Sequence, residues 1–169
     1  MNKQDEVVFS TEDILAITPG TINELKQRAK KSPRKRYRLC MHHDHSDSTQ
    51  EMLIACCNDT YMPPHRHPLN KTESYHVVEG SMVVYFFDDE GTVIRRLAMG
   101  EYSSGDACLY RLSKPVWHMP VPTSEWLIYH ECYTGPFDKD IDVTYPDWAP
   151  DEVDKKAVTE FLQRVCVYG

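Results

Sequence analysis

Two histidines one residue apart, His65 and His67, are the side chains of this sequence whose types and spacing point most directly to metal chemistry. Prolines on both sides disfavour a helix, so we expect an extended segment in which both imidazoles point to one side. Five residues separate His67 from Glu73, which opens an apolar run that ends at Gly80. Two imidazoles and a carboxylate delivered by neighbouring strands are ligands that borderline divalent metals accept. Two ordinary surface histidines are the alternative for the pair alone.

A fourth candidate ligand is His118, which follows a Pro turn much later in the chain. A His-x-His pair, a spacer, Glu73, six residues and Gly80, with one later His, resembles the two motifs of the cupin superfamily. Most cupins place three or four residues in the spacer where this chain has five, which leaves the role of Glu73 open. The resemblance implies one divalent transition metal per chain, and Zn, Fe, Ni, Mn and Co are all compatible with such donors. The ligands it implies are His65, His67, Glu73 and His118.

The composition indicates one folded domain and argues against some classes of partner. The chain has 169 residues, 41% of them apolar, and a formal net charge of −7, so we expect no nucleic-acid partner. The basic run 28–38 is the exception, and it is either a solvated helix end and loop or a contact for a phosphate or acidic sugar. No apolar run approaches the ~20 residues of a membrane helix, and the N-terminus lacks a signal-peptide core. We therefore predict a cytoplasmic protein without membrane insertion.

Residues 1–36 predict a helical extension that is too small to be a domain of its own. A short helix is expected over residues 11–17, and the Thr-Pro-Gly sequence at 18–20 should end it. Thr21 and Glu24 form a capping box for a second helix over residues 22–31. We expect this extension to pack on the outside of the domain or across a subunit interface.

From residue 37 the apolar pattern changes to short runs separated by turn residues, which predicts a mainly β, antiparallel barrel over residues 37–150. Residues 82–87 are apolar at both parities. We expect one face of that strand in the barrel and the other against a partner chain or the N-terminal helices. This second face is compatible with a homodimer. The predicted strands are 50–57, 74–78, 82–87, 92–99, 107–112, 116–121 and 126–133.

Residues 151–169 predict a C-terminal helix. Six apolar residues between positions 153 and 165 fall on one helical face, and three early acidic residues suit the helix N-terminus. We see no internal repeat. The predicted fold class is therefore a single cupin (jelly-roll) domain with a helical extension at each end.

A longer ordered series of residues extends the match to known sequences: Ser32–Arg34, Arg36, Arg38, His42, Gln50, Pro64–His67, Lys71, Glu73, Phe87–Gly91, Trp117, His118, Gly135–Phe137 and Trp148–Glu152. Together they resemble the WbuC-type cupin-fold metalloprotein family, which is associated with gene clusters for O-antigen polysaccharide synthesis. The resemblance runs from about residue 10 to residue 155. That family usually has Asn two residues before its counterpart of His42, where this chain has Cys40. The resemblance implies a fold and a metal more directly than a reaction.

Three further side chains are candidates for a substrate pocket. Tyr75 shares a strand face with Glu73, and a core tyrosine is the alternative. Arg111 would bind a carboxylate or phosphate if it points inward, and is otherwise an exposed edge residue. His42 matches a position of the resembled family and is expected near the mouth of the pocket. The wider stretch 42–45, which holds three histidines, is either a second metal site or a surface loop.

Three functions fit such a site, each with a small-molecule ligand such as a saccharide. The first is a small metal-dependent isomerase, epimerase or lyase acting on a sugar or nucleotide-sugar intermediate of surface polysaccharide (O-antigen) synthesis, as the family resemblance implies. The second is a non-catalytic sugar-binding or regulatory cupin. The third is a metal-dependent dioxygenase, which requires iron. Three imidazoles and one carboxylate leave coordination positions open for a ligand in every case.

Overall fold

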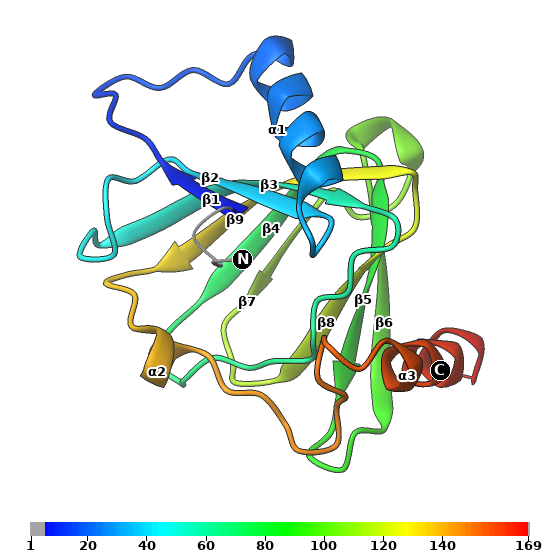
Figure 1. Cartoon of the computed structure of the whole chain (residues 1–169). Coiled ribbons are helices and arrows are strands. Elements are labelled where there is room, and N and C mark those ends of the chain that lie inside the picture. Colours follow the sequence, from blue (N-terminus) through cyan, green and yellow to red (C-terminus); the bar gives the residue numbers. More distant parts are fainter. Residues whose placement is uncertain (1–5, 169) are drawn as a thin grey trace.

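Two β-sheets face each other in the part of the chain that the computed structural model describes, residues 6–168. Figure 1 shows the larger sheet as one wall and the smaller sheet as the other, which confirms the predicted mainly β jelly roll. The named strands pair antiparallel, apart from β1 and β2, which run parallel. In spatial order the larger sheet contains β1 (Val7–Phe9), β2 (Arg36–Cys40), β3 (Thr49–Cys57), β9 (Trp126–Thr134), β4 (Glu73–Glu79) and β7 (Leu109–Leu112), and the smaller contains β6 (Val93–Gly100), β5 (Ser81–Phe87) and β8 (Trp117–Pro122).

The inner faces of both sheets form the main core. Met52 of β3, Val77 of β4 and Val84 of β5 are buried there together. Directly opposite residues of an antiparallel pair point to the same face, so the register defines continuous inward rows of side chains. One such row crosses four strands of the larger sheet through Cys40, Met52, Glu131 and Tyr75.

The outer face of the larger sheet is covered by helix α1 (Pro19–Lys31), as Figure 1 shows. Leu25 and Ala29 of the helix are buried in one cluster with Leu53 of β3 and Ile128 of β9. This is the outer packing expected for the N-terminal extension. Its amphipathic face positions the helix on the wall, away from the barrel interior.

The N-terminal segment differs from the prediction in two ways. Residues 11–17 form no helix, and β1 before them pairs with β2, so part of the extension belongs to the sheet. Thr18 begins α1 where we expected it to end a helix: its hydroxyl accepts a hydrogen bond from Thr21 N at 3.3 Å. Pro19 takes the first helical position, where its missing N–H costs nothing.

The outer face of the smaller sheet is covered by the C-terminal helix α3 (Lys155–Tyr168), as Figure 1 shows. Tyr85 and Phe87 of β5 pack in one cluster with Phe161 of this helix. The second apolar face of residues 82–87 therefore packs on α3 and not on the N-terminal helix. The helix also starts four residues later than predicted, which leaves Val153 80% exposed. Within residues 6–168 no helix is long and apolar enough to cross a membrane.

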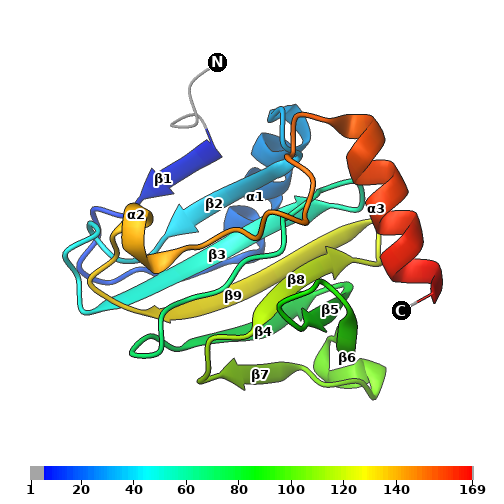
Figure 2. The same cartoon turned by 90° about the horizontal axis from the view of Figure 1, so that it is seen from below.

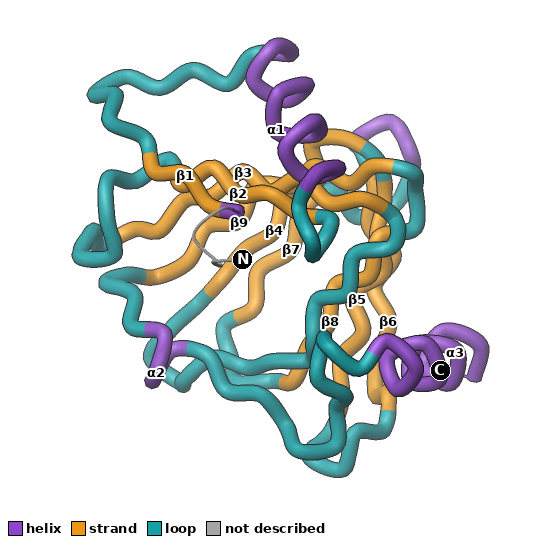
Figure 3. Tube along the Cα trace, viewed as in Figure 1, coloured by secondary structure: helices purple, strands orange, loops and turns teal. Residues whose placement is uncertain are grey.

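Two long connections, residues 58–72 and 135–154, run beneath the sheets, and Figures 2 and 3 show them side by side. The second connection carries the short helix α2 (Lys139–Asp142). Arg66 and Thr144 exchange backbone hydrogen bonds of 3.0 Å and join the two connections. A short 3-10 helix, Tyr102–Ser104, lies elsewhere, between β6 and β7. Distant parts of the sequence thus meet under the barrel.

Candidate metal centre

The four predicted ligands meet at one point on the inner side of the barrel. One ligand atom from each of them lies within 4.8 Å of all the others. Two ligand atoms on a shared ion lie at most about 4.4 Å apart, twice a bond of about 2.2 Å, so little adjustment is needed. Within residues 6–168 no other group of His, Cys, Asp and Glu side chains is arranged this way. We call this group, His65, His67, Glu73 and His118, the His/Glu cluster.

Backbone pairing sets the positions of these ligands. His65 N donates to His118 O at 3.0 Å and His118 N donates to His65 O at 2.9 Å, which places the two residues opposite each other. Both imidazoles therefore turn to the same face, with ring centroids 4.2 Å apart. In the five-residue spacer a turn forms, in which Lys71 N donates to Pro68 O at 3.0 Å. Glu73 then starts β4 and joins the cluster, so the long spacer does not displace it.

Each imidazole of the cluster is oriented by a backbone carbonyl. A carbonyl oxygen only accepts hydrogen bonds, so Nδ1 carries a proton in all three rings. The opposite nitrogen, Nε2, is left to face the centre of the cluster, which is how second-layer partners orient histidines in protein metal sites. The acceptors are Pro63 O for His65 at 2.9 Å, Asp142 O for His67 at 2.7 Å and Val116 O for His118 at 3.0 Å.

Glu73 lies between two of the imidazoles. Its Oε1 is 2.6 Å from His118 Nε2, and its Oε2 is 3.2 Å from His67 Nε2. Glu73 and His118 are 1% and 0% exposed. His118 Nε2 nevertheless has no aligned hydrogen-bond partner within residues 6–168. A buried nitrogen of this kind needs a partner, and a cation shared with the carboxylate would supply it.

Burial and mutual charge set the protonation of the cluster. Burial raises the pKa of Glu73, but the charge of His118 and the contacts from both imidazoles outweigh it and hold that pKa well below its usual value. Burial lowers the pKa of His67, but the hydrogen bond to Glu73 and its charge outweigh burial, so the net pKa is raised. Burial, together with the charge of His118, lowers the pKa of His65 to about 3. A metal ion would therefore displace a proton from His67.

A buried ion pair supports His67 from behind. The carboxylate of Asp142 lies 3.3 Å from Lys71 Nζ, and its backbone oxygen is the acceptor for His67. Lys71 Nζ also donates to Thr134 O at 3.1 Å, which ties the pair to β9. Lys71 belongs to the family match described above. Nothing in the sequence singled out Asp142, because only the docking of the two long connections brings it to His67.

The three predicted pocket residues lie in three different environments. Tyr75 is 2% exposed, and its ring centroid is 6.5 Å from that of His118. His42 is buried near the interior against Phe9, with ring centroids 5.5 Å apart. Arg111 is exposed on the outer face, where it donates to Thr72 Oγ1 at 3.1 Å, so it does not line the barrel as predicted. In the register of β7 with β4, Arg111 lies opposite Ser74, between the inward-facing Glu73 and Tyr75, so the exposed-edge alternative holds.

Strand β9 places a carboxylate, Glu131, on its inward face, and the sequence alone did not show which face of β9 points inward. Glu131 faces inward with Tyr129, while His130 faces the outer side. Burial raises the pKa of Glu131 to about 7, with the charge of Glu73 adding to the rise and Arg38 opposing it. An inward acidic residue beside the His/Glu cluster was not predictable until the face of β9 was known.

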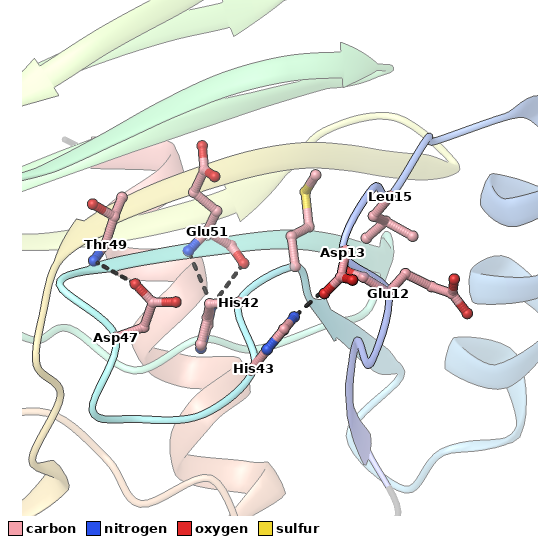
Figure 4. Close-up of a pocket in the computed structure, with 9 residues that line it drawn as sticks. Glu12, Asp13, Leu15, His42, His43, Asp47, Thr49 and Glu51 are labelled. Atoms are coloured by element: carbon pink, nitrogen blue, oxygen red, sulfur yellow. Dashed lines mark hydrogen bonds between the residues drawn. The ribbon is translucent and has the colours of Figure 1, made fainter.

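The second histidine-rich stretch, residues 42–45, lies beside a separate polar hollow of about 330 Å³ that Figure 4 shows. His42 is held by Glu51, whose backbone N and O both lie 3.0 Å from Nδ1. His43 and His45 are exposed, and His43 Nε2 contacts Glu12 O at 3.4 Å. In the described chain these histidines do not meet at a common point, which favours the surface-loop interpretation for His43 and His45.

Comparison with known proteins supports the fold. A family profile described as "Domain of unknown function (DUF6016)" matches residues 17–99, and no curated protein matches the sequence. Protein SO0799 from Shewanella oneidensis is similar in structure, with 10% identity, a TM-score of 0.54, and 68% of this chain and 75% of that chain covered. An oxalate oxidase in complex with the substrate analogue glycolate has 11% identity and a TM-score of 0.51, and the match covers 69% of this chain and 57% of that chain. The capsular polysaccharide assembling protein CapF from Staphylococcus aureus has 15% identity and a TM-score of 0.51, and the match covers 62% of this chain and 30% of that chain.

These likenesses define the class of the protein by its fold. The chain has the cupin fold, and it spans less than two thirds of the length of the oxalate oxidase and CapF chains. Among residues 6–168 it carries one candidate metal-binding group, the His/Glu cluster.

Proposed function

We propose that this chain is a metal-binding cupin whose His/Glu cluster holds one divalent transition metal. The observation that carries the proposal is the set of three Nδ1–carbonyl bonds, which leave three Nε2 atoms gathered around one carboxylate. When bound, the ion would polarise a carbonyl or hydroxyl of a ligand or lower the pKa of a water molecule. Neutral imidazoles and a carboxylate suit Zn, Fe, Ni, Mn or Co.

We propose further that the protein is a small enzyme of isomerase, epimerase or lyase type, acting on a sugar or nucleotide sugar of surface polysaccharide (O-antigen) synthesis. The ordered residue match to the WbuC-type family supports this. Tyr75 and Glu131 line the inner wall beside the cluster, where they would contact a substrate. Lys71 and Asp142 would keep His67 in its orientation. The burial of Glu73 keeps bulk water away from the carboxylate.

Two narrower proposals concern the setting of the protein. A cytoplasmic location stays a prediction. A homodimer stays a prediction, although the β5 face that suggested it packs on α3. A sedimentation mass of two chains is expected, and a mass of one chain would refute the dimer.

The metal proposal is tested by comparing His118→Ala with His76→Ala. His76 lies on the same strand as Glu73 but is exposed on its outer face, so it is a matched control. Protein purified without added metal, and then stripped and titrated with Co²⁺, should hold about one ion per chain in the wild type and in His76→Ala. His118→Ala should hold none. Equal metal content in all three proteins would contradict the proposal.

The catalytic proposal needs a separate experiment. Metal-loaded protein is incubated with a panel of sugars, sugar acids and nucleotide sugars, and the products are analysed by mass spectrometry and NMR. Conversion that stops when a chelator is added supports the enzyme. Binding of a saccharide without conversion would make the protein a non-catalytic cupin. Iron as the native metal, with oxygen consumed, would make it a dioxygenase.

A further inference from the structure

A second pair of charged side chains faces the barrel interior, apart from the His/Glu cluster. Arg38 of β2 lies opposite Ile54 of β3, and Glu131 of β9 lies opposite Met52. Both apolar neighbours belong to the inner core, so the register places Arg38 and Glu131 on the inner face. The residues on either side of Arg38, Tyr37 and Leu39, pack outward under α1.

The two charges lie close enough to influence each other without forming an ion pair. The positive charge of Arg38 opposes the rise in the pKa of Glu131, so the two groups share one environment. No salt bridge or side-chain hydrogen bond involves either residue within residues 6–168. Both side chains are half-buried. The guanidinium donors and the carboxylate acceptors are therefore free to bind something else.

Unused charged groups inside a barrel require an explanation. An enclosed charge is costly unless it is paired and hydrogen-bonded, and burial at a ligand site is a common reason for tolerating it. If Arg38 and Glu131 served only to neutralise each other, we would expect them to form a direct ion pair. Two other arginines of the basic run have direct acidic partners: Arg28 is 2.6 Å from Glu24 at the surface, and Arg34 is 3.3 Å from the buried Glu6.

We propose that Arg38 and Glu131 form the ligand-binding wall of the barrel, and that the ligand is a small polyhydroxylated molecule with one anionic group. Arg38 binds a carboxylate or phosphate through its planar donors. Glu131 accepts hydrogen bonds from neighbouring hydroxyls. The ligand's far end faces the His/Glu cluster, because Glu131 lies on the strand next to the one that carries Glu73.

The strand order limits the size of this ligand. Arg38 and Glu73 lie on β2 and β4, which are separated by β3 and β9. Three spacings of about 4.8 Å across the sheet give about 14 Å, and Arg38 is level with Val77, four residues or about 13 Å along β4 from Glu73. The backbones are therefore about 19 Å apart along the sheet, and the curvature of the barrel and the reach of both side chains shorten the gap for the ligand. A monosaccharide acid or a monosaccharide phosphate has the right dimensions and chemistry. The proposal deepens the proposed function and rests on it only where it places the ligand beside a metal.

The test measures binding of gluconate, glucose 6-phosphate and glucose by isothermal titration, with metal-free and with metal-loaded protein. The variants are Arg38→Gln, Arg38→Lys and, as a matched control, Arg111→Gln, which changes an exposed arginine on the outer face. Circular dichroism confirms that each variant is folded. Gluconate and glucose 6-phosphate distinguish a carboxylate ligand from a phosphate ligand.

The wild type and Arg111→Gln should bind at least one charged probe about tenfold more tightly than glucose, and Arg38→Gln should lose about tenfold or more. Arg38→Lys should fold and lose less, because it keeps the charge. No preference for charged probes in the wild type, or equal binding by wild type and both Arg38 variants, would overturn the proposal. Arg38-dependent binding in a protein that takes up no metal would refute the metal centre alone. Metal uptake without Arg38-dependent binding would refute the ligand wall alone.

The role of Glu131 is tested with acetate, an anion without hydroxyl groups. The wild type should prefer gluconate to acetate, and Glu131→Ala should lose about threefold or more of this preference, because the hydroxyl acceptor is gone. An unchanged preference in Glu131→Ala would remove Glu131 from the ligand wall.

Discussion

Two histidine-rich stretches of this chain are alike in sequence and different in structure. His65 and His67 meet Glu73 and His118 at one point inside the barrel. His43 and His45, in contrast, stay exposed on a connection between β2 and β3. Both stretches consist of short-spaced histidines in a non-helical segment. The spacing of histidines therefore does not decide which stretch is a candidate metal site.

The difference lies in what surrounds the rings. Each imidazole of the His/Glu cluster has a carbonyl acceptor on Nδ1, and a strand far away in sequence supplies His118. In the other stretch the backbone of Glu51 holds His42 at 3.0 Å, and the exposed His43 has only a 3.4 Å contact with Glu12 O. A metal site needs rigid elements that converge, and a local sequence motif supplies only part of it.

The largest expected effect is the difference in metal affinity between two variants, each of which replaces one histidine of one stretch. His67→Ala should weaken Co²⁺ or Zn²⁺ binding by more than about 100-fold, because it removes a ligand and leaves Glu73 with one fewer partner. His43→Ala should leave the affinity unchanged, because that side chain is exposed on the loop. Competition with a chromophoric chelator measures both values. A loss in His43→Ala as large as that in His67→Ala would reverse the assignment of the two stretches.

The pH dependence of metal binding should also set the cluster apart. The pKa of His67 is raised above its usual value of 6.5. At pH 6.5, and at higher pH up to the raised pKa, the ion must therefore displace a proton from His67. Metal affinity should rise by up to about tenfold per pH unit until the raised pKa is passed. Titration calorimetry in two buffers of different ionisation enthalpy measures the released proton. An affinity that is flat between about pH 6 and pH 8 contradicts the raised pKa of His67.

His65 and His67 also determine how the free energy of unfolding of the metal-free protein changes with pH. His65, with a pKa of about 3 in the folded state, contributes stability above about pH 6.5 that is lost as the pH falls toward 3. His67, with a raised pKa, contributes stability below about pH 6.5 that is lost as the pH rises through the raised value. Urea unfolding of the metal-free protein over this range follows both trends.

A smaller effect should come from the ion pair behind His67. Lys71→Met should weaken metal binding by about tenfold and lower the free energy of unfolding by about 3 kcal/mol, because it leaves the carboxylate of Asp142 buried and unpaired. Lys156→Met is the control, since that lysine pairs with Glu160 in solvent. If Lys71→Met loses stability but keeps full metal affinity, the pair supports the fold and does not orient His67.

The smallest effect should come from the outer layer. Thr18→Ala removes the N-terminal cap of α1 and should lower the free energy of unfolding by about 1 kcal/mol without changing metal affinity. Chemical denaturation and chelator competition check the two quantities. A change in metal affinity would mean that the outer helix communicates with the cluster.

Much of the fold was predictable because strand patterns are local. The seven predicted strands after residue 49 all exist, with ends shifted by at most a few residues. The N-terminal segment was not predictable in the same way, since residues 7–9 join a sheet through a strand that follows much later. The start of α1 was misjudged because Thr-Pro-Gly suits a helix N-terminus as well as a break.

The candidate site was predictable in its ligands and not in its supports. Histidine and glutamate types with the cupin-like spacing pointed to His65, Glu73 and His118 before any geometry was known. The inward faces of Arg38 and Glu131 depend on strand register, and a register shift of one residue exchanges the two faces. The same uncertainty left the face of Arg111 open until the register was known.

The most direct test of the metal centre is X-ray absorption spectroscopy of the wild-type protein loaded with one equivalent of Zn²⁺. Our account predicts a first shell of nitrogen and oxygen at about 2.0–2.2 Å, with multiple-scattering features of three imidazoles. A shell with sulfur ligands at about 2.3 Å, or with fewer than three imidazoles, would contradict it.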